Sequence, residues 1–311
     1  MSEPMVSRLR RRAMTVPTML GATAVAVLGL PVLAPVLTIS DLVRGRRRLP
    51  RLRTYLFVTQ YLINDSVEIV LAPVFWLAAG LGTRLDSAPS LARHRRLQWW
   101  SLDLLATRAE QLLGLPVELD EGSEAAIEPG PVIVIGRHAS LFDASLAGLV
   151  YGRAGYAVRG VVLAELLADP GFDLIYGRLG SVFIPRDDGS AARTAIEAMA
   201  HSVRRHDGER AAVVLFPEGR LFRPDVRDRT LTRLAERDPA RAERLAGLTN
   251  VLPPRPGGLR VLLEAMPEAD VVLLDHRGLD DLGTMTDLAD VVPVHRPVRI
   301  SARAMRLAET R

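Results

Sequence analysis

The sequence predicts an α/β domain built on a mixed, mostly parallel sheet covered by helices, preceded by an N-terminal, apolar membrane-anchoring helical segment. From about residue 86, β-branched apolar runs alternate with Ala-, Leu- and Arg-rich runs of helical character, an order typical of helix-covered sheets. Residues 14–39 contain no charged side chain and have arginine clusters on both sides. We therefore expect a membrane-associated region at 1–85 and a catalytic or binding domain at 86–311.

Composition limits the possible chemistry. Of the 311 residues, 48% are apolar, which is enough for a packed core. The chain has no cysteine, so disulfides, thiolate metal sites and a cysteine nucleophile are excluded. All 40 basic residues are arginines, and the formal net charge is +4.

The arginines form two N-terminal clusters that indicate an anionic partner, either lipid head groups or nucleic acid. The apolar segment lies directly between them, which favours lipid, so we expect no nucleic-acid partner. The clusters consist of Arg8, Arg10, Arg11 and Arg12, and of Arg44, Arg46, Arg47, Arg48, Arg51 and Arg53.

Residues 14–39 are long enough to cross a bilayer as a helix. Pro31 and Pro35 would kink or break such a helix, and the long apolar run without a clear cleavage pattern argues against a signal peptide. Arginine-rich flanks prefer the cytoplasmic side, and a full crossing would put one cluster on the wrong side. We favour a re-entrant or in-plane segment, broken near Pro31, on the cytoplasmic face of the cell membrane and in contact with anionic lipid. A true span and a buried core helix are the alternatives.

A second apolar stretch covers residues 55–82 and carries Asn64, Asp65 and Glu68 near its middle. Charged side chains are costly in lipid. This stretch is therefore predicted to be amphipathic or partly buried in protein.

The remaining elements follow from the hydrophobic patterns. Residues 91–113 predict a helix with mixed faces. We expect strands at 117–119, 132–135, 158–163, 181–184, 211–216, 270–274 and 298–301, and further helices at 143–153, 190–206, 229–246 and 257–266. The charged stretch 221–250 indicates a solvated helical insertion after one strand.

Residues 136–143 read GRHASLFD, which places His138 at the end of a predicted strand and Asp143 at the start of a helix. Within one regular helix this spacing turns the two side chains about 140° apart, but a loop histidine and an aspartate in the first helical turn can meet. The carboxylate would then hold one imidazole nitrogen protonated, and the other could take a proton from an alcohol. Alternatively, Ser140 and Asp143 form a capping box and His138 is only a polar loop residue.

Spacing alone does not identify the pair, because His276 and Asp281 repeat it. They also follow an apolar, strand-like run, VVLL.

Three further stretches lie at predicted strand ends or before a helix: GSVFIPRDDGS at 180–190, VVLFPEGRLFRP at 213–224 and VLPPRPGG at 251–258. Arg186, Arg220 and Arg255 could supply bidentate donors to a phosphate, and Gly219 could bring a backbone N–H close to the same ligand. In the alternative interpretation, residues 217–219 form only a tight turn, Arg186 is solvated, and residues 256–257 are an ordinary loop.

The order of these stretches resembles the glycerophospholipid acyltransferases, the lysophosphatidate acyltransferase-like family. That family combines H-x4-D, G-x-x-F-I-x-R, F-P-E-G and a proline-bearing motif, here over roughly residues 130–275. The order favours His138 over His276, since only His138 precedes the other three motifs. Arg137 stands where the family commonly has Asn, and no Thr separates Gly219 from Arg220.

The resemblance implies a glycerolphosphate acyltransferase-like fold and roles for single residues. His138 would be the general base and Asp143 its orienting partner. Phe216, Pro217, Glu218 and Gly219, with Arg186, Arg220 and Arg255, would bind the phosphate-bearing acceptor, Glu218 by ordering arginines or its own loop.

The implied activity is transfer of a fatty acyl group from acyl-CoA or acyl-carrier protein to a lysophospholipid such as 1-acyl-glycerol-3-phosphate, with no metal and no cofactor. Two alternatives stay open. One is an acyltransferase of the same fold with another acceptor, such as glycerol 3-phosphate, lysocardiolipin or a non-phospholipid alcohol. The other is a non-catalytic, lipid-binding membrane-surface protein.

Overall fold

A single seven-stranded sheet organises the chain in the order β1-β7-β6-β2-β5-β3-β4. The computed structural model describes residues 3–127, 130–140, 142–186, 188–204, 210–280, 282 and 285–305. The strands are β1 (Val117–Leu119), β2 (Val132–Gly136), β3 (Ala157–Leu163), β4 (Val182–Ile184), β5 (Ala211–Leu215), β6 (Asp270–Arg277) and β7 (Val298–Met305). β6, β2, β5, β3 and β4 run parallel, and β7 pairs antiparallel with β6. This confirms the predicted mixed, mostly parallel sheet.

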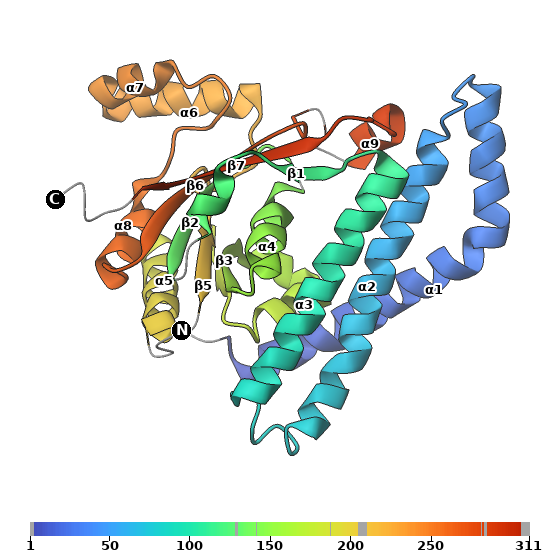
Figure 1. Ribbon diagram of the computed structural model, residues 1–311, viewed down its shortest axis with the longest axis horizontal. Helices are drawn as coiled ribbons and strands as arrows, with labels where there is room; N and C mark the ends of the chain where they lie inside the picture. The colour runs from blue at the N-terminus through green and yellow to red at the C-terminus, as the bar shows by residue number, and fades with distance from the viewer. Residues whose placement is uncertain are drawn as a thin grey trace.

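Helices cover both faces of the sheet (Figure 1). One face packs against α4 (Asp143–Arg153) and the N-terminal helices, and the other packs against α5 (Gly189–Arg204) and α8 (Pro256–Ala265). Side chains alternate between these layers as strand geometry requires. Val132 and Val134 of β2 lie in the α4 layer, whereas Ile133 lies in the α5–α8 layer.

Several boundaries differ from the prediction. β6 and β7 extend to Arg277 and Met305, beyond the expected ends at 274 and 301, because their antiparallel ladder continues through the polar residues. The predicted helix 229–246 is two helices, α6 (Pro224–Arg237) and α7 (Pro239–Ala246). The chain breaks at Asp238, whose side chain caps α7 by accepting from Arg241 N. Helix α9 (Met285–Val291) was not predicted.

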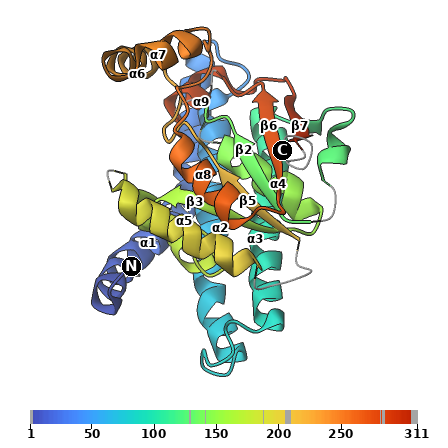
Figure 2. The same ribbon diagram turned by 90° about the vertical axis from the view of Figure 1, so that its left-hand side faces the viewer.

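The α6–α7 pair lies at the end of the sheet toward which β6 points (Figures 1 and 2). Both helices are largely exposed, which confirms the predicted solvated helical insertion after β5. Short irregular helices complete the fold: η1 (Ala109–Leu113), η2 (Ser123–Ala126), η3 (Ala164–Ala168) and η4 (Phe172–Tyr176).

Three long helices form the N-terminal part: α1 (Met5–Val43), α2 (Pro50–Ala78) and α3 (Ala88–Arg108). The polar residues of α2 face protein, as predicted for this stretch. Asn64, Asp65 and Glu68 are all buried, and Asn64 Nδ2 donates to Ser101 O of α3 at 3.0 Å. The Gly171 backbone lies against the carboxylates of Asp65 and Glu68, where a larger residue would not fit.

α1 is not broken at Pro31, contrary to the prediction of a segment broken there. It continues from Met5 to Val43 with Pro17, Pro31 and Pro35 inside it, and Figure 1 shows that it changes direction sharply part-way along, at the right of the view. A proline removes one helical hydrogen bond and clashes with the preceding turn, and a bend relieves that clash without ending the helix.

Leu273 and Leu274 are neighbours on β6 but point to opposite faces of the sheet, so replacing each by alanine should lower the free energy of unfolding by different amounts. Leu274 is 4% exposed in the α4 layer, whereas Leu273 is 41% exposed. Leu274→Ala should lower the free energy of unfolding by about 2–5 kcal/mol, because it leaves a cavity. Leu273→Ala should lower it by less than about 1 kcal/mol. Urea unfolding followed by circular dichroism measures both, and equal losses would contradict the layer assignment.

Candidate active site

The predicted site residues follow the carboxyl ends of parallel strands. His138 follows β2, Glu218 follows β5 and Arg186 follows β4, while His276 lies near the end of β6. Parallel strands end at one edge of the sheet, where ligands bind in open α/β sheets. Sheet topology therefore brings together segments that are far apart in the sequence.

His138 and Asp143 form a hydrogen-bonded pair. Nδ1 of His138 lies 2.8 Å from Oδ1 of Asp143, so the carboxylate accepts from Nδ1–H and leaves Nε2 as the basic nitrogen. The Asp143 side chain is fully buried, whereas that of His138 is 27% exposed. The His138 ring therefore lies between the buried carboxylate of Asp143 and the exposed surface of the site.

The second oxygen of Asp143 binds the backbone. Oδ2 accepts from Ala139 N at 2.5 Å and from Ser140 N at 2.7 Å, which is one half of the capping box. On the other side of the cap, Ser140 Oγ accepts from Phe142 N at 3.3 Å instead of from Asp143 N, and its hydroxyl donates to Leu282 O at 2.8 Å. The pair and the cap are thus both present, one on each oxygen of the same carboxylate.

These contacts keep Asp143 charged. Burial raises the pKa of its carboxyl. The hydrogen bond from His138, the proximity of the His276 ring and the hydrogen bond from the Ser140 N–H together outweigh burial, so the pKa lies below its ordinary value.

Glu218 joins two loops of the site. Its Oε1 accepts from His138 N and its Oε2 accepts from Leu252 N, each at 2.8 Å. Burial raises the pKa of the Glu218 carboxyl above its ordinary value, although the two backbone donors lower it in part. Glu218 therefore orders the histidine loop and the third motif, whereas the sequence suggested that it orders arginines or its own loop.

The Phe216 ring packs against the His138 ring, and it can do so because it passes close to the backbone of Gly136. Its ring centroid is 4.9 Å from that of His138. A Cβ added at Gly136 would lie 2.5 Å from the Phe216 ring, so only glycine fits at the end of β2. Phe222 N donates to His138 O at 2.6 Å, which holds the histidine backbone from the other side.

Residues 216–219 form the predicted tight turn. Gly219 N donates to Phe216 O at 3.0 Å, and Gly219 has φ +64°, a conformation that favours glycine. Arg255 N donates to Pro217 O at 2.8 Å, and the Arg255 side chain passes 3.7 Å from a Cβ built on Gly219. Arg255 and Arg220 are both exposed at this turn.

Arg186 is placed further along the edge. β4 is separated from β5 by β3, so Arg186 follows a strand about 10 Å from the one before Glu218. Its Nε donates to Glu165 Oε1 at 3.0 Å. Within the described part of the chain, Arg186 forms no hydrogen bond or ion pair with the His138–Asp143 pair, with the turn or with Arg255.

His276 lies beside the same aspartate as His138. Its Nε2 is 3.5 Å from Asp143 Oδ2, although the two histidines are far apart in the sequence. Asp281, the partner that spacing alone offers for His276, lies outside the described residues.

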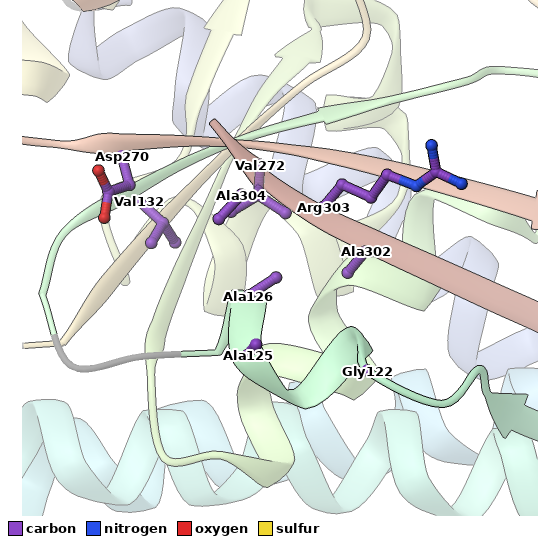
Figure 3. Close-up of a pocket in the computed structure, with 9 residues that line it drawn as sticks. All are labelled: Gly122, Ala125, Ala126, Val132, Asp270, Val272, Ala302, Arg303 and Ala304. Atoms are coloured by element: carbon purple, nitrogen blue, oxygen red, sulfur yellow. The ribbon is translucent and has the colours of Figure 1, made fainter. Parts of the chain in front are cut away.

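A cavity of about 280 Å3 lies elsewhere, between η2 and the strands (Figure 3). Small side chains such as Ala126 and Ala302 line it, with Asp270 and Arg303 at its sides. Asp270 and Val132 begin their strands, so the cavity is at the opposite end of the sheet from His138.

The family model Acyltransferase matches residues 119–281, slightly more than half of the chain. The chain belongs to the acyltransferase family. This confirms the family that the order of the motifs predicts. The matched region contains His138, Asp143 and the two following motifs, together with the third motif at 251–258.

One similar solved structure is the 1-acyl-sn-glycerophosphate (LPA) acyltransferase PlsC from Thermotoga maritima. It has 18% sequence identity and a TM-score of 0.45, over 80% of this chain and 87% of that chain. No curated protein matches this acyltransferase.

Sequence reasoning missed three features of the acyltransferase site: Gly136, Leu252 N and the contact of His276 with Asp143. A glycine directly after a β-branched run signals a close backbone approach, so Gly136 could have been found. The other two depend on strand order and have no local signal.

The carboxylate of Glu218 clamps two loops by accepting from His138 N and Leu252 N, and the substitution Glu218→Gln tests this clamp. The amide nitrogen of Gln cannot accept a hydrogen bond, so either His138 N or Leu252 N stays unpaired. The free energy of unfolding should fall by about 1–3 kcal/mol, measured by urea titration. Glu264→Gln is the matched control, since the Glu264 side chain is 57% exposed, and it should change stability by less than about 0.5 kcal/mol. An equally small effect at Glu218 would rule out the clamp.

Proposed function

We propose that this acyltransferase moves a fatty acyl group from an acyl thioester to the free hydroxyl of a lysophospholipid such as 1-acyl-glycerol-3-phosphate, with His138 as general base. The observation that carries this proposal is the His138–Asp143 pair. The buried carboxylate accepts from Nδ1, and Nε2 belongs to a partly exposed ring at the ligand-binding edge of the sheet. That arrangement is suited to taking a proton from a bound alcohol.

The chemistry requires only groups in place and the two substrates. Nε2 takes the proton of the acceptor hydroxyl as its oxygen attacks the thioester carbonyl. The resulting imidazolium is stabilised by Asp143, as in a triad whose serine is replaced by substrate. The C–S bond then breaks, the thiolate receives the proton from His138, and an ester and a free thiol leave.

The acceptor head group would bind at the turn 216–219. Arg220 and Arg255 are exposed there, and no described carboxylate pairs with either guanidinium. Both are therefore available for a phosphate. Gly219 keeps the turn open beside Arg255, and Phe216 with Pro217 would form the wall next to His138. Arg186 would have to leave Glu165 or contact a more distant part of the substrate.

The donor would be acyl-CoA or acyl-carrier protein, whose thioester is already activated. The reaction needs neither a metal nor a cofactor in this proposal, because proton transfer by His138 and thiolate departure complete it.

The N-terminal helices would bring the site to the membrane. α1 and α2 are long and apolar enough to cross a membrane by length and composition. α1 exposes many large apolar side chains, among them Val25, Leu28, Val32 and Val43. Phe57 of α2 packs edge-on against Phe142, the residue before Asp143, so this region adjoins the catalytic pair.

Contacts at both ends of α1 support an in-plane anchor. At one end, Arg12 Nε donates to Asp173 Oδ2 at 2.7 Å, and Arg11 donates to Leu167 O at 2.9 Å. At the other end, Arg46 pairs with Asp290 at 2.6 Å. Both arginine clusters therefore contact the same α/β domain. A helix tied at both ends to one domain would lie in one face of the bilayer, and the positive charge favours the cytoplasmic face.

Replacing His138 tests the proposed reaction. His138→Ala should lower the rate of thiol release from acyl-CoA with lysophosphatidate by about 10²–10⁴, the usual contribution of a general base. His201→Ala is the control, since the His201 side chain is 50% exposed on α5, and it should leave the rate unchanged. Normal turnover by folded His138→Ala would disprove the assignment.

A panel of acceptors identifies the substrate in the same assay. Products from lysophosphatidate, other lysophospholipids, glycerol 3-phosphate and simple alcohols are separated by mass spectrometry. An ester formed only with glycerol 3-phosphate or another non-lysophospholipid acceptor would favour an acyltransferase of the same fold that acts on that acceptor. Liposome binding without any thiol release would favour a non-catalytic lipid-binding protein.

The in-plane anchor makes a separate topological prediction, and the natural absence of cysteine makes labelling specific. Arg10→Cys, Arg47→Cys and the domain marker Arg244→Cys each place a thiol at an exposed position. A membrane-impermeant maleimide should label all three from the same, cytoplasmic side, in inverted vesicles but not in right-side-out ones. Labelling of Arg10→Cys and Arg47→Cys from opposite sides would show that α1 spans.

A further inference from the structure

His276 occupies a position where an apolar side chain is expected. It lies on β6 opposite Ile300 of β7 and points to the same face as Val272 and Leu274, both members of the α4-side core. The residue is 1% exposed. A leucine or phenylalanine would continue this core without any polar group.

The buried imidazole of His276 lacks the hydrogen bonds that would offset the cost of burying a polar ring. Neither ring nitrogen has a hydrogen-bond partner within the described residues, and a buried polar group without one reduces stability. The polar group that faces it is the carboxylate of Asp143, 3.5 Å from Nε2. Packing alone therefore does not explain a histidine here.

We propose that His276 is a positioning residue for acyl transfer, acting on His138 through the shared carboxylate of Asp143. This inference rests on the proposed function. The Asp143 carboxylate selects the tautomer that carries hydrogen on Nε2, because a lone pair at that distance would repel the anion. The three side chains then form a row, His138–Asp143–His276.

The contact would act in two ways. The N–H at Nε2 of His276 attracts Oδ2 at 3.5 Å and so limits rotation of the carboxylate, which keeps Oδ1 aligned with Nδ1 of His138. Its N–H also draws part of the negative charge toward Oδ2, which moderates how strongly Asp143 stabilises the His138 imidazolium. Removing the N–H should therefore have two effects. The carboxylate rotates more freely, which lowers kcat, and it regains its full negative charge, which makes His138 easier to protonate.

Several other charged groups lie near His138, Asp143 and His276, and substitution of His276 leaves them unchanged. Glu218, from the loop after β5, binds His138 N, and Arg137 pairs with Asp280 after β6. From β7, Arg299 lies opposite Arg277 next to His276 in the ladder. None of them is changed by substitution at His276.

Two substitutions separate positioning from packing. His276→Phe keeps a ring of similar size and removes both nitrogens, whereas His276→Gln places an amide N–H close to the position of Nε2. A structural role predicts that Phe is tolerated and Gln is not. The positioning role predicts the reverse for activity.

The full-length protein in lipid micelles is assayed with acyl-CoA and lysophosphatidate between pH 5 and 9. For His276→Phe we expect kcat about tenfold lower, KM within twofold, an unchanged or higher melting temperature, and an acid limb of the pH profile moved to higher pH. For His276→Gln we expect kcat within about threefold and an unmoved acid limb. The surface variant His201→Gln should match the wild type. Wild-type kcat and acid limb in His276→Phe, or a larger activity loss in His276→Gln than in His276→Phe, would overturn the inference.

A second measurement is independent of turnover. Proton NMR of the histidine rings, with His138 assigned from His138→Ala, follows its titration in wild type and in His276→Phe. We expect the midpoint to move to higher pH in the variant, and an unmoved midpoint would overturn the inference. If the wild type transfers no acyl group, the proposed function fails, while this titration still decides whether His276 acts on His138.

Discussion

The carboxylate of Asp143 is the constraint on which the site depends. It is a buried charge, and such a group must be surrounded by donors to be kept in the folded state. The donors come from the loop that precedes it, through His138 Nδ1 and two backbone N–H groups. The loop must therefore turn back on itself before α4 begins, and this turn presents the histidine at the edge of the sheet. β6 must also continue far enough to place His276 behind the same group.

A second buried carboxylate connects the separate loops. Glu218 accepts from the backbone of both the histidine loop and the third motif, although it belongs to neither. Close backbone approaches complete the assembly: Gly136 makes room for the Phe216 ring, and Gly219 turns the chain beside Arg255. The motifs are thus joined through main-chain groups, which leaves His138 Nε2 and the exposed arginines available to substrate. The acidic residues hold the site together, and in the proposed function the basic residues bind the substrate.

The N-terminal helices belong to the same construction. α2 buries its polar residues against α3 and the segment around Gly171, while its Phe57 contacts the residue before Asp143. α1 adds an apolar outer surface and is tied to the α/β domain at both ends by arginines. The His138–Asp143 pair is therefore one aromatic contact away from the apolar N-terminal helices, which suits the proposed transfer to an acceptor in a membrane.

The sequence by itself determined the positions of the strands, the helix-covered sheet and the family. β-branched runs place β1, β2 and β5 within a residue of their observed ends, and the order of the motifs selects His138 with Asp143. It could not determine the length of β6 or the continuity of α1. It also could not assign the roles of contacts between distant residues. Gly136 has a local sequence signal. The contacts of His276 with Asp143, of Leu252 N with Glu218 and of Arg186 with Glu165 have none. These contacts depend on which strands are neighbours in the sheet. Hydrophobic period and turn residues encode hydrogen bonds a few positions apart, whereas strand order results from packing the whole core. Only the tertiary structure could therefore place a second histidine behind the aspartate.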